Sequence, residues 1–249
     1  GYPYYQECLA FAPYMAVPVP ARRAASAAAR HLPEGTHGRR FLMRGAHPLP
    51  ERYIRLEYNF PWAEALDLLA PELGARCAAA PTPWELAAPL FAEIEADEIT
   101  AMQTADILTW IQQDILLKAD KMSMASSLEL RVPFLDREVF ALASTLPASQ
   151  RVGRRETKIA LRAAAARTLP QATAAMPKQG FVTPLAQWLQ EEPWHSQVRE
   201  VLNSERARRF FRTDRLNALL DEHQCGPRSH MKKIWSAYCF LNWHEQYFG

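Results

Sequence analysis

Apolar residues recur at intervals of three and four positions more clearly between Ala105 and Leu128 than elsewhere in the chain. They are Leu108, Ile111, Ile115, Ala119, Met122 and Ala125. This spacing predicts a helix over 105–128 whose apolar stripe faces a core. On its polar side, Asp114 and Lys118 stand four residues apart in the acid-before-base order that stabilises helices.

The same spacing predicts further helices, and the chain has little strand signal apart from the LRVPFLD region. One helix is expected after Asp136, a suitable N-cap, and it should stop at Pro147. The others are expected near 51–59, 62–70, 155–169, 184–190, 213–223 and 230–248. The fold class predicted from the pattern alone is therefore mainly α.

The loop MPKQGFVTPLAQWLQ, residues 176–190, places one lysine in a specified backbone. Pro177 fixes its own φ, and Gly180 permits backbone angles that other residues avoid. Thr183 and Pro184 resemble an N-cap followed by the first helical residue. A loop that holds Lys178 in this way is either a site or a connection, and the pattern does not choose between them.

Composition excludes several classes of protein. The 249 residues are 49% hydrophobic with a formal net charge of +2, so they can bury a core but give no basis for general nucleic-acid binding. The four cysteines form no CxxC pair. No apolar run approaches the roughly 20 residues that cross a bilayer, and the first residues lack a signal-peptide pattern. We expect a cytoplasmic protein.

Catalytic motifs that can be identified from residues alone are lacking: no phosphate-binding glycine loop, HExxH or GxSxG occurs. His223, Cys225 and His230 do not match a zinc spacing, so no metal site is expected. Charged residues do gather in or beside the apolar helix in DILLKADKMSMASSLELRVPFLD, residues 114–136. From composition, a solvated helix face is the more economical interpretation of them.

At these residues, however, the sequence resembles the synthetase domain of glutamine-dependent asparagine synthetases. Residues 114–136 are similar to that family's (Lys/Arg)-x-Ser-Met-Ala core and Leu-Glu-x-Arg-Val-Pro-Phe-Leu-Asp ending. TKIALRAAAARTLP resembles its Lys-x-x-Leu-Arg helix, and PKQGFVTPLAQWL resembles its Pro-Lys-Gln-Gly-Phe loop and following helix. The three motifs also occur in the family's order.

The resemblance implies a fold and a domain organisation. Two family motifs are not in this sequence, the Ser-Gly-Gly-x-Asp-Ser pyrophosphate loop and the acidic motif whose tail resembles Gly1-Tyr2. We therefore expect residues 1–249 to be the helical C-terminal half of an adenine-nucleotide α-hydrolase-like (PP-loop) α/β synthetase domain. The glutaminase domain would be a missing partner, and Cys8 does not replace its nucleophile. Association of the chain into a homo-oligomer is also considered.

The resemblance further implies an activity. The complete protein would use ATP and Mg²⁺ to adenylate a carboxylate and would then transfer glutamine-derived ammonia to it. The expected carboxylate substrate is aspartate. Lys178 would be the catalytic lysine facing the phosphates. Nucleotide or pyrophosphate binding is suggested for Lys158, Asp120 and Lys121. Residues that support the loops would be Glu129, Arg131, Asp136 and Gly180, with Glu129 and Arg131 forming a buried ion pair.

Two alternatives stay open. The first is a relative that adenylates another carboxylate in amidation or ring closure, because the residues that select aspartate lie largely upstream. The second is a noncatalytic helical fragment, since the magnesium ligands are not in this chain. In either case, helices made to cover a sheet would leave an apolar face that favours association.

Overall fold

The computed structural model describes residues 2–33, 35–54, 60–177, 180 and 183–249, and these are mainly helical, as predicted. Within these ranges, β structure is limited to two isolated bridges, Leu69 with Phe211 and Val152 with Thr157. Lys178, the proposed catalytic residue, lies outside the described residues. The chain divides into two compact units, which are taken separately below. Unit 1 comprises residues 1–56 and 84–178, and unit 2 comprises residues 57–83 and 179–249.

Unit 1 begins with short helices that pack around a small core. They are η1 (Pro3–Tyr5), α1 (Gln6–Met15), α2 (Val19–Arg30), α3 (Arg39–Arg44), α4 (Leu49–Ile54) and α7 (Pro83–Ala92). Phe11 of α1 stacks on Phe41 of α3 with ring centroids 4.3 Å apart. The guanidinium of Arg52 lies 4.9 Å from the Phe11 ring centroid and pairs with Glu98, which satisfies a buried charge.

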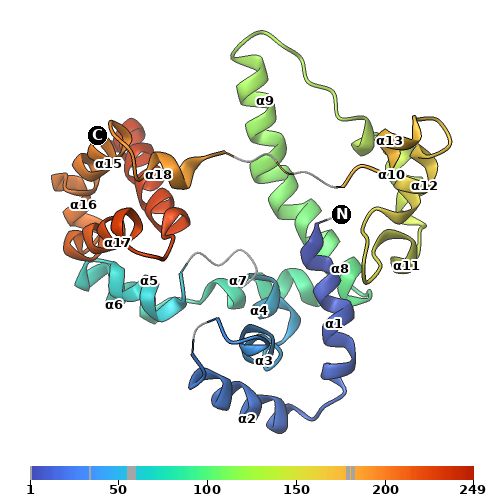
Figure 1. Ribbon diagram of the computed structural model, residues 1–249, viewed down its shortest axis with the longest axis horizontal. Coiled ribbons are helices and arrows are strands. Elements are labelled where there is room, and N and C mark those ends of the chain that lie inside the picture. The colour runs from blue at the N-terminus through green and yellow to red at the C-terminus, as the bar shows by residue number, and fades with distance from the viewer. Residues whose placement is uncertain (1, 34, 55–59, 178–179, 181–182) are drawn as a thin grey trace. The chain divides into compact units, whose positions relative to one another are not determined.

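The central element of unit 1 is a continuous helical rod, seen in green in Figure 1. It consists of α8 (Glu98–Asp106), the π-helical segment η3 (Ile107–Leu116) and α9 (Leu117–Met124). Asp97 caps α8, because its carboxylate accepts from the backbone N–H groups of Ile99 and Thr100. The Asp114–Lys118 pair predicted on the rod is present at 3.5 Å.

The apolar stripe of this rod does not face a core in the structure, contrary to the prediction. Leu108 is 43% exposed and Met122 66% exposed. The core of unit 1 instead uses α8, with Ile99, Met102 and Ala105 packed near Tyr5 and Phe91. The helical spacing was right, but no described segment covers the second half of the rod.

The remaining helices of unit 1 are short and exposed. They are η4 (Pro133–Leu135), α10 (Arg137–Ser144), α11 (Ala148–Arg151), α12 (Ile159–Ala165) and α13 (Gln171–Ala174). Their apolar residues, including Phe134 and Leu142, are largely accessible. The end of α11 differs, because Val152, directly after the helix, is buried in the core that contains α8, and Ala148 of α11 packs against the same core. The helix predicted over 155–169 is therefore confirmed only for its central part.

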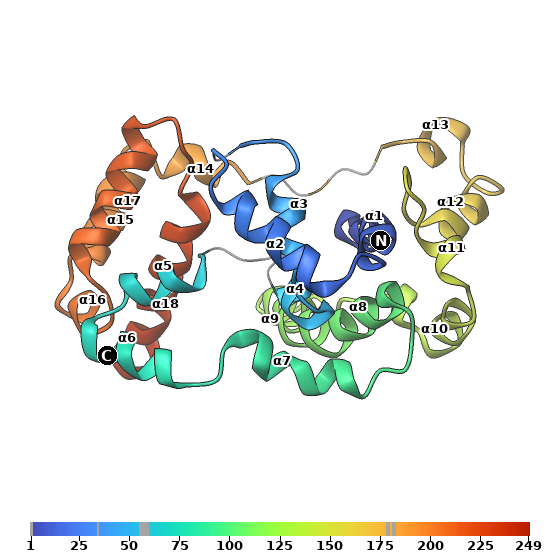
Figure 2. The ribbon, with the colours of Figure 1, turned by 90° about the horizontal axis from the view of Figure 1, so that it is seen from below.

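Unit 2 has a more continuous core. Its helices are α5 (Trp62–Leu68), α6 (Pro71–Ala79), α14 (Leu185–Trp188), α15 (Trp194–Leu202), α16 (Glu205–Phe210), α17 (Thr213–Cys225) and α18 (Met231–Phe248). α15, α17 and α18 pack together, as Figure 2 shows. Leu202, Leu216, Leu220, Ile234 and Leu241 are fully buried among them. These leucines and isoleucine repeat at helical spacing, which is why the last two predicted helices are confirmed.

Two boundaries in unit 2 differ from the sequence prediction. The helix predicted over 62–70 ends at Leu68, and Pro71 opens the next helix, α6. Helix α14 begins at Leu185, with Pro184 as its N-cap residue rather than its first helical residue. Thr183 makes no cap hydrogen bond to α14. Proline suits both positions because each lies at a helix start, where its missing N–H leaves no bond unmade. Among the described residues, no helix is long and apolar enough to span a membrane.

Candidate functional site

The loop around Lys178 is described at Gly180 and again from Thr183. Gly180 is exposed, and a Cβ added there would meet nothing within 4 Å. Its φ lies outside the left-handed region, so the structure does not use the backbone freedom that the sequence suggested for this glycine. A glycine at this position is therefore required neither by its φ nor by local space in the chain.

Lys158 occupies a strained position before α12. It has φ 60° and ψ 36°, a left-handed conformation that is uncommon for residues other than glycine and asparagine. Its backbone N–H donates to the carbonyl of Arg151 at 2.8 Å, which closes the turn formed by the Val152–Thr157 bridge. Such strain persists only where surrounding contacts hold it, and it often marks functional positions.

The turn before Lys158 is attached to the core of unit 1. Arg151 donates from Nη2 to Thr100 Oγ1 at 2.6 Å and from Nη1 to Gln103 of α8. Gln6 of α1 donates from Nε2 to the carbonyl of Gly153 at 2.8 Å. The start of α12 is therefore held by the best-packed helices of the unit, even though α12 itself is exposed.

Arg162 connects α12 to the segment that leads to Lys178. Its Nη1 donates to the carbonyl of Met176 at 3.1 Å and to that of Ala174 at 3.4 Å. Met176 is two residues before Lys178. Sequence reasoning placed Arg162 in a motif but gave it no role. The signal available was its position one helical turn after Lys158, at the end of Lys-x-x-Leu-Arg.

Asp120 and Lys121 lie on α9 and are exposed. In the part of the chain that the structure describes, neither side chain has a hydrogen-bond or ion-pair partner. No such contact therefore links Asp120 or Lys121 to α12. The structure thus places Lys158 directly before α12 and Arg162 within it, where Arg162 bonds to the carbonyls before Lys178. Asp120 and Lys121 make no described contact with these residues. No pre-formed site contains all four.

The Glu129–Arg131 ion pair exists, but it is not buried as predicted. The side chains are 69% and 82% exposed, with Arg131 Nη2 2.6 Å from Glu129 Oε1. Residues two apart on an extended segment point to the same side, which permits the contact without any burial. An exposed pair of this kind contributes about 0–1 kcal/mol, so it does not by itself fix the loop.

Asp136 is placed as the sequence predicted. Its Oδ1 accepts from the backbone N–H groups of Glu138 at 2.9 Å and Val139 at 3.3 Å, and it forms the N-cap of α10. The cap satisfies donors that have no partner inside the helix. Local geometry accounts for Asp136 fully, so its presence in a family motif does not require a catalytic role.

Cysteine and histidine chemistry is restricted by burial. Burial raises the pKa of the Cys8 thiol to about 12, so the sulfur remains protonated and unreactive near neutral pH. His223 is buried with both ring nitrogens occupied: Nε2 bonds to the carbonyl of Ala186 at 2.9 Å, and Nδ1 accepts from the His230 N–H at 3.2 Å. Among the described residues, no group of three His, Cys, Asp or Glu side chains is arranged to hold a metal.

Comparison with known proteins gives a consistent result. The profile of the asparagine synthase family matches residues 1–245. A putative asparagine synthetase [glutamine-hydrolyzing] of Mycobacterium tuberculosis is 38% identical over 248 residues, 98% of this chain and 37% of the relative. Asparagine synthetase [glutamine-hydrolyzing] 1 of Bacillus subtilis is 35% identical over 249 residues, 98% of this chain and 38% of the relative.

The chain thus spans less than two fifths of the length of these curated relatives. No solved structure gives a significant match.

Proposed function

Because the chain belongs to the asparagine synthase family, we propose that it is part of an ATP-dependent amide-forming synthetase. The complete protein adenylates a carboxylate, of which aspartate is the first candidate, and transfers glutamine-derived ammonia to give asparagine, AMP and pyrophosphate. The observation that carries this proposal is the family match over residues 1–245, which includes all three motifs in order.

Within that reaction, Lys178 is proposed to stabilise the charge that builds up on the phosphates. The substrate carboxylate attacks the α-phosphorus of ATP, and pyrophosphate leaves with its negative charge. A fixed ammonium close to these oxygens favours the transition state over the ground state, because the charge increases as the bond breaks. Lysine suits this role as a compact point charge. ATP and Mg²⁺ would bind in the complete protein, and Mg²⁺ would supply further positive charge to the phosphates there.

The contacts before Lys178 support this proposal. Arg162 bonds the carbonyls of Ala174 and Met176, and the turn that starts α12 is bonded to α8 through Arg151. A lysine that must approach a phosphate within hydrogen-bond distance needs such a supporting shell, since small displacements cost catalytic rate. We propose that α12 supplies it, with the Lys158 ammonium adding a second positive charge.

The proposal is tested in the complete protein with Lys178→Ala and Lys178→Arg, measuring ATP–pyrophosphate exchange and amide formation. We expect Lys178→Ala to lower the exchange rate about 100-fold, as loss of one transition-state donor does, and Lys178→Arg to restore only part of it. A normal rate for Lys178→Ala would contradict the role of this lysine. Comparing aspartate with other carboxylates in the same assay identifies the substrate, and exchange with another carboxylate alone would favour the non-aspartate relatives.

The 249-residue polypeptide by itself is proposed to lack turnover. A single lysine does not replace a phosphate loop and magnesium ligands. Measurable pyrophosphate release by the purified chain would contradict this part of the proposal.

A further inference from the structure

Positive charge is concentrated in one segment of unit 1, although the chain as a whole is nearly neutral. Residues 22–44 contain six arginines and a single acidic residue, Glu34, which lies outside the described residues. Arg22 is buried and bonded to backbone carbonyls of Val17 and Gly45, and Arg44 pairs with Glu7. Arg23, Arg30, Arg39 and Arg40 have no ion-pair partner within the described ranges. The described part of α2 and α3 therefore carries a basic surface, on which no acidic side chain pairs with these four arginines.

A cavity of about 440 Å³ opens at the loop between these two helices. It is lined by Gly35, Thr36, Gly38, Arg39 and Arg40. Gly35 and Gly38 have φ values of 90° and 81°, a conformation that strains other residues, so the loop shape depends on both glycines. None of the lining residues that the structure describes has a large apolar side chain, which disfavours a hydrophobic ligand.

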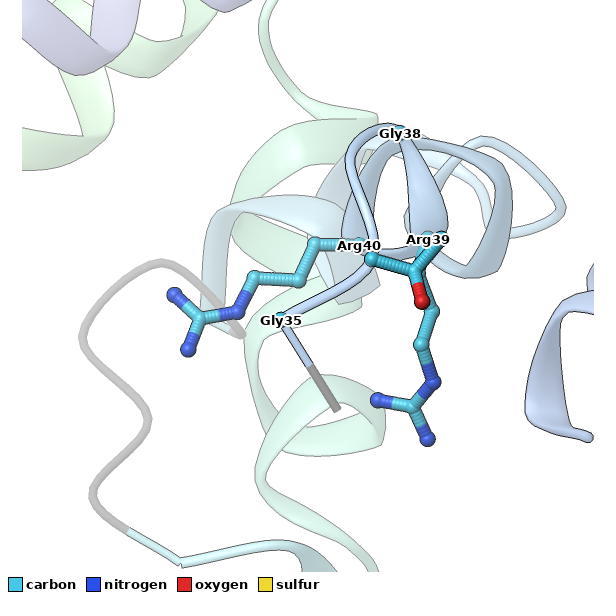
Figure 3. A pocket seen from close by; sticks show the side chains of 5 residues that line it. Gly35, Gly38, Arg39 and Arg40 are labelled. Atoms are coloured by element: carbon cyan, nitrogen blue, oxygen red, sulfur yellow. The ribbon is translucent and has the colours of Figure 1, made fainter. Parts of the chain in front are cut away.

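The two arginines of the cavity retain donors for a ligand. Arg39 donates from Nε to the carbonyl of Ala29 at 3.2 Å, a contact that fixes the side chain near the end of α2 and leaves its two Nη groups without a partner among the described residues. Arg40 is exposed, and its guanidinium has no such partner either. Figure 3 shows the two guanidinium groups on either side of Gly35. Planar guanidinium groups bind phosphate oxygens in pairs of hydrogen bonds.

We propose that this cavity, lined by Arg39 and Arg40, binds the phosphate group of a small molecule. The pairing of a cavity with two lining arginines whose Nη groups have no partner among the described residues carries the inference, because an anion there gains direct charge-assisted hydrogen bonds. The phosphate could be free or part of a phosphomonoester, since both present the same oxygens.

The test is a titration of the ¹⁵N-labelled full chain with inorganic phosphate, followed through the amide signals of Gly35, Thr36 and Gly38 at constant ionic strength. We expect saturable shifts at these signals with a Kd on the order of 1 mM, which corresponds to a few charge-assisted hydrogen bonds. Ribose 5-phosphate is the second probe. If ribose 5-phosphate binds more tightly than inorganic phosphate, the cavity recognises a phosphomonoester. If the two probes bind equally, the cavity recognises the phosphate group alone.

Two sets of variants distinguish phosphate binding in the cavity from a general electrostatic effect of the basic surface. Arg40→Gln, which keeps the contact of Arg39 with Ala29, should weaken phosphate binding about tenfold. The matched control is Arg23→Gln with Arg30→Gln, which removes charge from α2 and leaves the cavity lining intact, and it should weaken binding less than threefold. Equal losses in both variants, or shifts that do not saturate, would overturn the proposal.

Discussion

The hydroxyl of Tyr53 donates a 2.5 Å hydrogen bond to Oδ1 of Asp106, a carboxylate that is 3% exposed. Tyr4 donates to Oδ2 at 2.5 Å, and Tyr5 donates to the same oxygen. Three hydroxyls from distant parts of the sequence thus satisfy one buried charge, as burial requires. This cluster joins η1 and α4 to the end of α8, where the helical rod begins.

The first prediction concerns alkaline pH. Burial, together with the hydrogen bond to Asp106, raises the pKa of Tyr4 and of Tyr5 above the ordinary value of 10.0. The stability that depends on these protonated hydroxyls is fully present below pH 10. Above it, the unfolded chain releases protons that the folded chain retains, so stability falls. The contribution of Tyr5 lowers the free energy of unfolding by at most about 1.4 kcal/mol per pH unit.

Thermal unfolding between pH 8 and pH 11 checks this prediction. Tyr5→Phe should lower stability at pH 8 by about 1.5–3 kcal/mol, the range for a hydrogen bond to a charged group, and should flatten the alkaline decline. Tyr247→Phe, at an exposed tyrosine of α18, is the matched control and should change neither. An unchanged alkaline slope in Tyr5→Phe would contradict the linkage.

The second prediction separates the backbone of Lys158 from its charge. Lys158→Gly relieves the left-handed strain and should raise the free energy of unfolding by about 1 kcal/mol, whereas Lys158→Gln keeps the strain and should leave it nearly unchanged. In the complete protein, both variants should lower ATP–pyrophosphate exchange about tenfold if the ammonium contacts phosphate. Full activity of Lys158→Gln would show that only the backbone of this residue matters.

The third prediction assigns Arg162 as a positioning residue for the Lys178 loop. Arg162→Gln removes the charged donor to the Ala174 and Met176 carbonyls. We expect kcat for amide formation to fall about tenfold in the complete protein, with the thermal midpoint and KM for ATP unchanged. Arg167→Gln, at an exposed arginine just after α12, is the control and should retain normal kcat. A fall in thermal midpoint that matches the fall in kcat would instead indicate a structural role.

The fourth prediction follows from the exposed apolar residues over 108–176. Phe134 is 67% exposed and Leu142 70% exposed, and further apolar side chains accompany them. Such a surface favours association, so the isolated chain should sediment as concentration-dependent oligomers and bind a hydrophobic dye. Phe134→Ser with Leu142→Ser should reduce both effects. Leu86→Ser, at a leucine of α7 with the same exposure, is the control. A sharp monomer at high concentration would contradict this prediction.

The fifth prediction tests the division into two units. Leu220 is fully buried in the core of unit 2, so Leu220→Ala should cost about 2–5 kcal/mol through lost contacts and a cavity. Hydrogen exchange should accelerate in α15, α17 and α18, while the amides of α1 and α8 keep their protection. Equal acceleration in α8 would show that the two units unfold together.

The sequence by itself determined what depends on near neighbours. The mainly α class, the helical spacing of 105–124 and the cap at Asp136 required only contacts over a few residues, and each is present in the structure. The motifs that identify the family are also local in sequence, which is why the resemblance agreed with the comparisons. The pattern did not determine the helix boundaries at Pro71 and Pro184, because proline suits both the end of one helix and the start of the next.

Tertiary structure decided which of these features are buried and which meet. The spacing of the apolar stripe on the rod predicts a face buried in a core. Whether that face is exposed depends on whether another segment packs against it. Asp106 looks unremarkable in sequence, and its role depends on tyrosines up to 102 positions away. Arg162 likewise gains its contacts from the way the chain returns after α13. Periodicity fixes the direction of a side chain on its helix, but only packing fixes what lies in that direction.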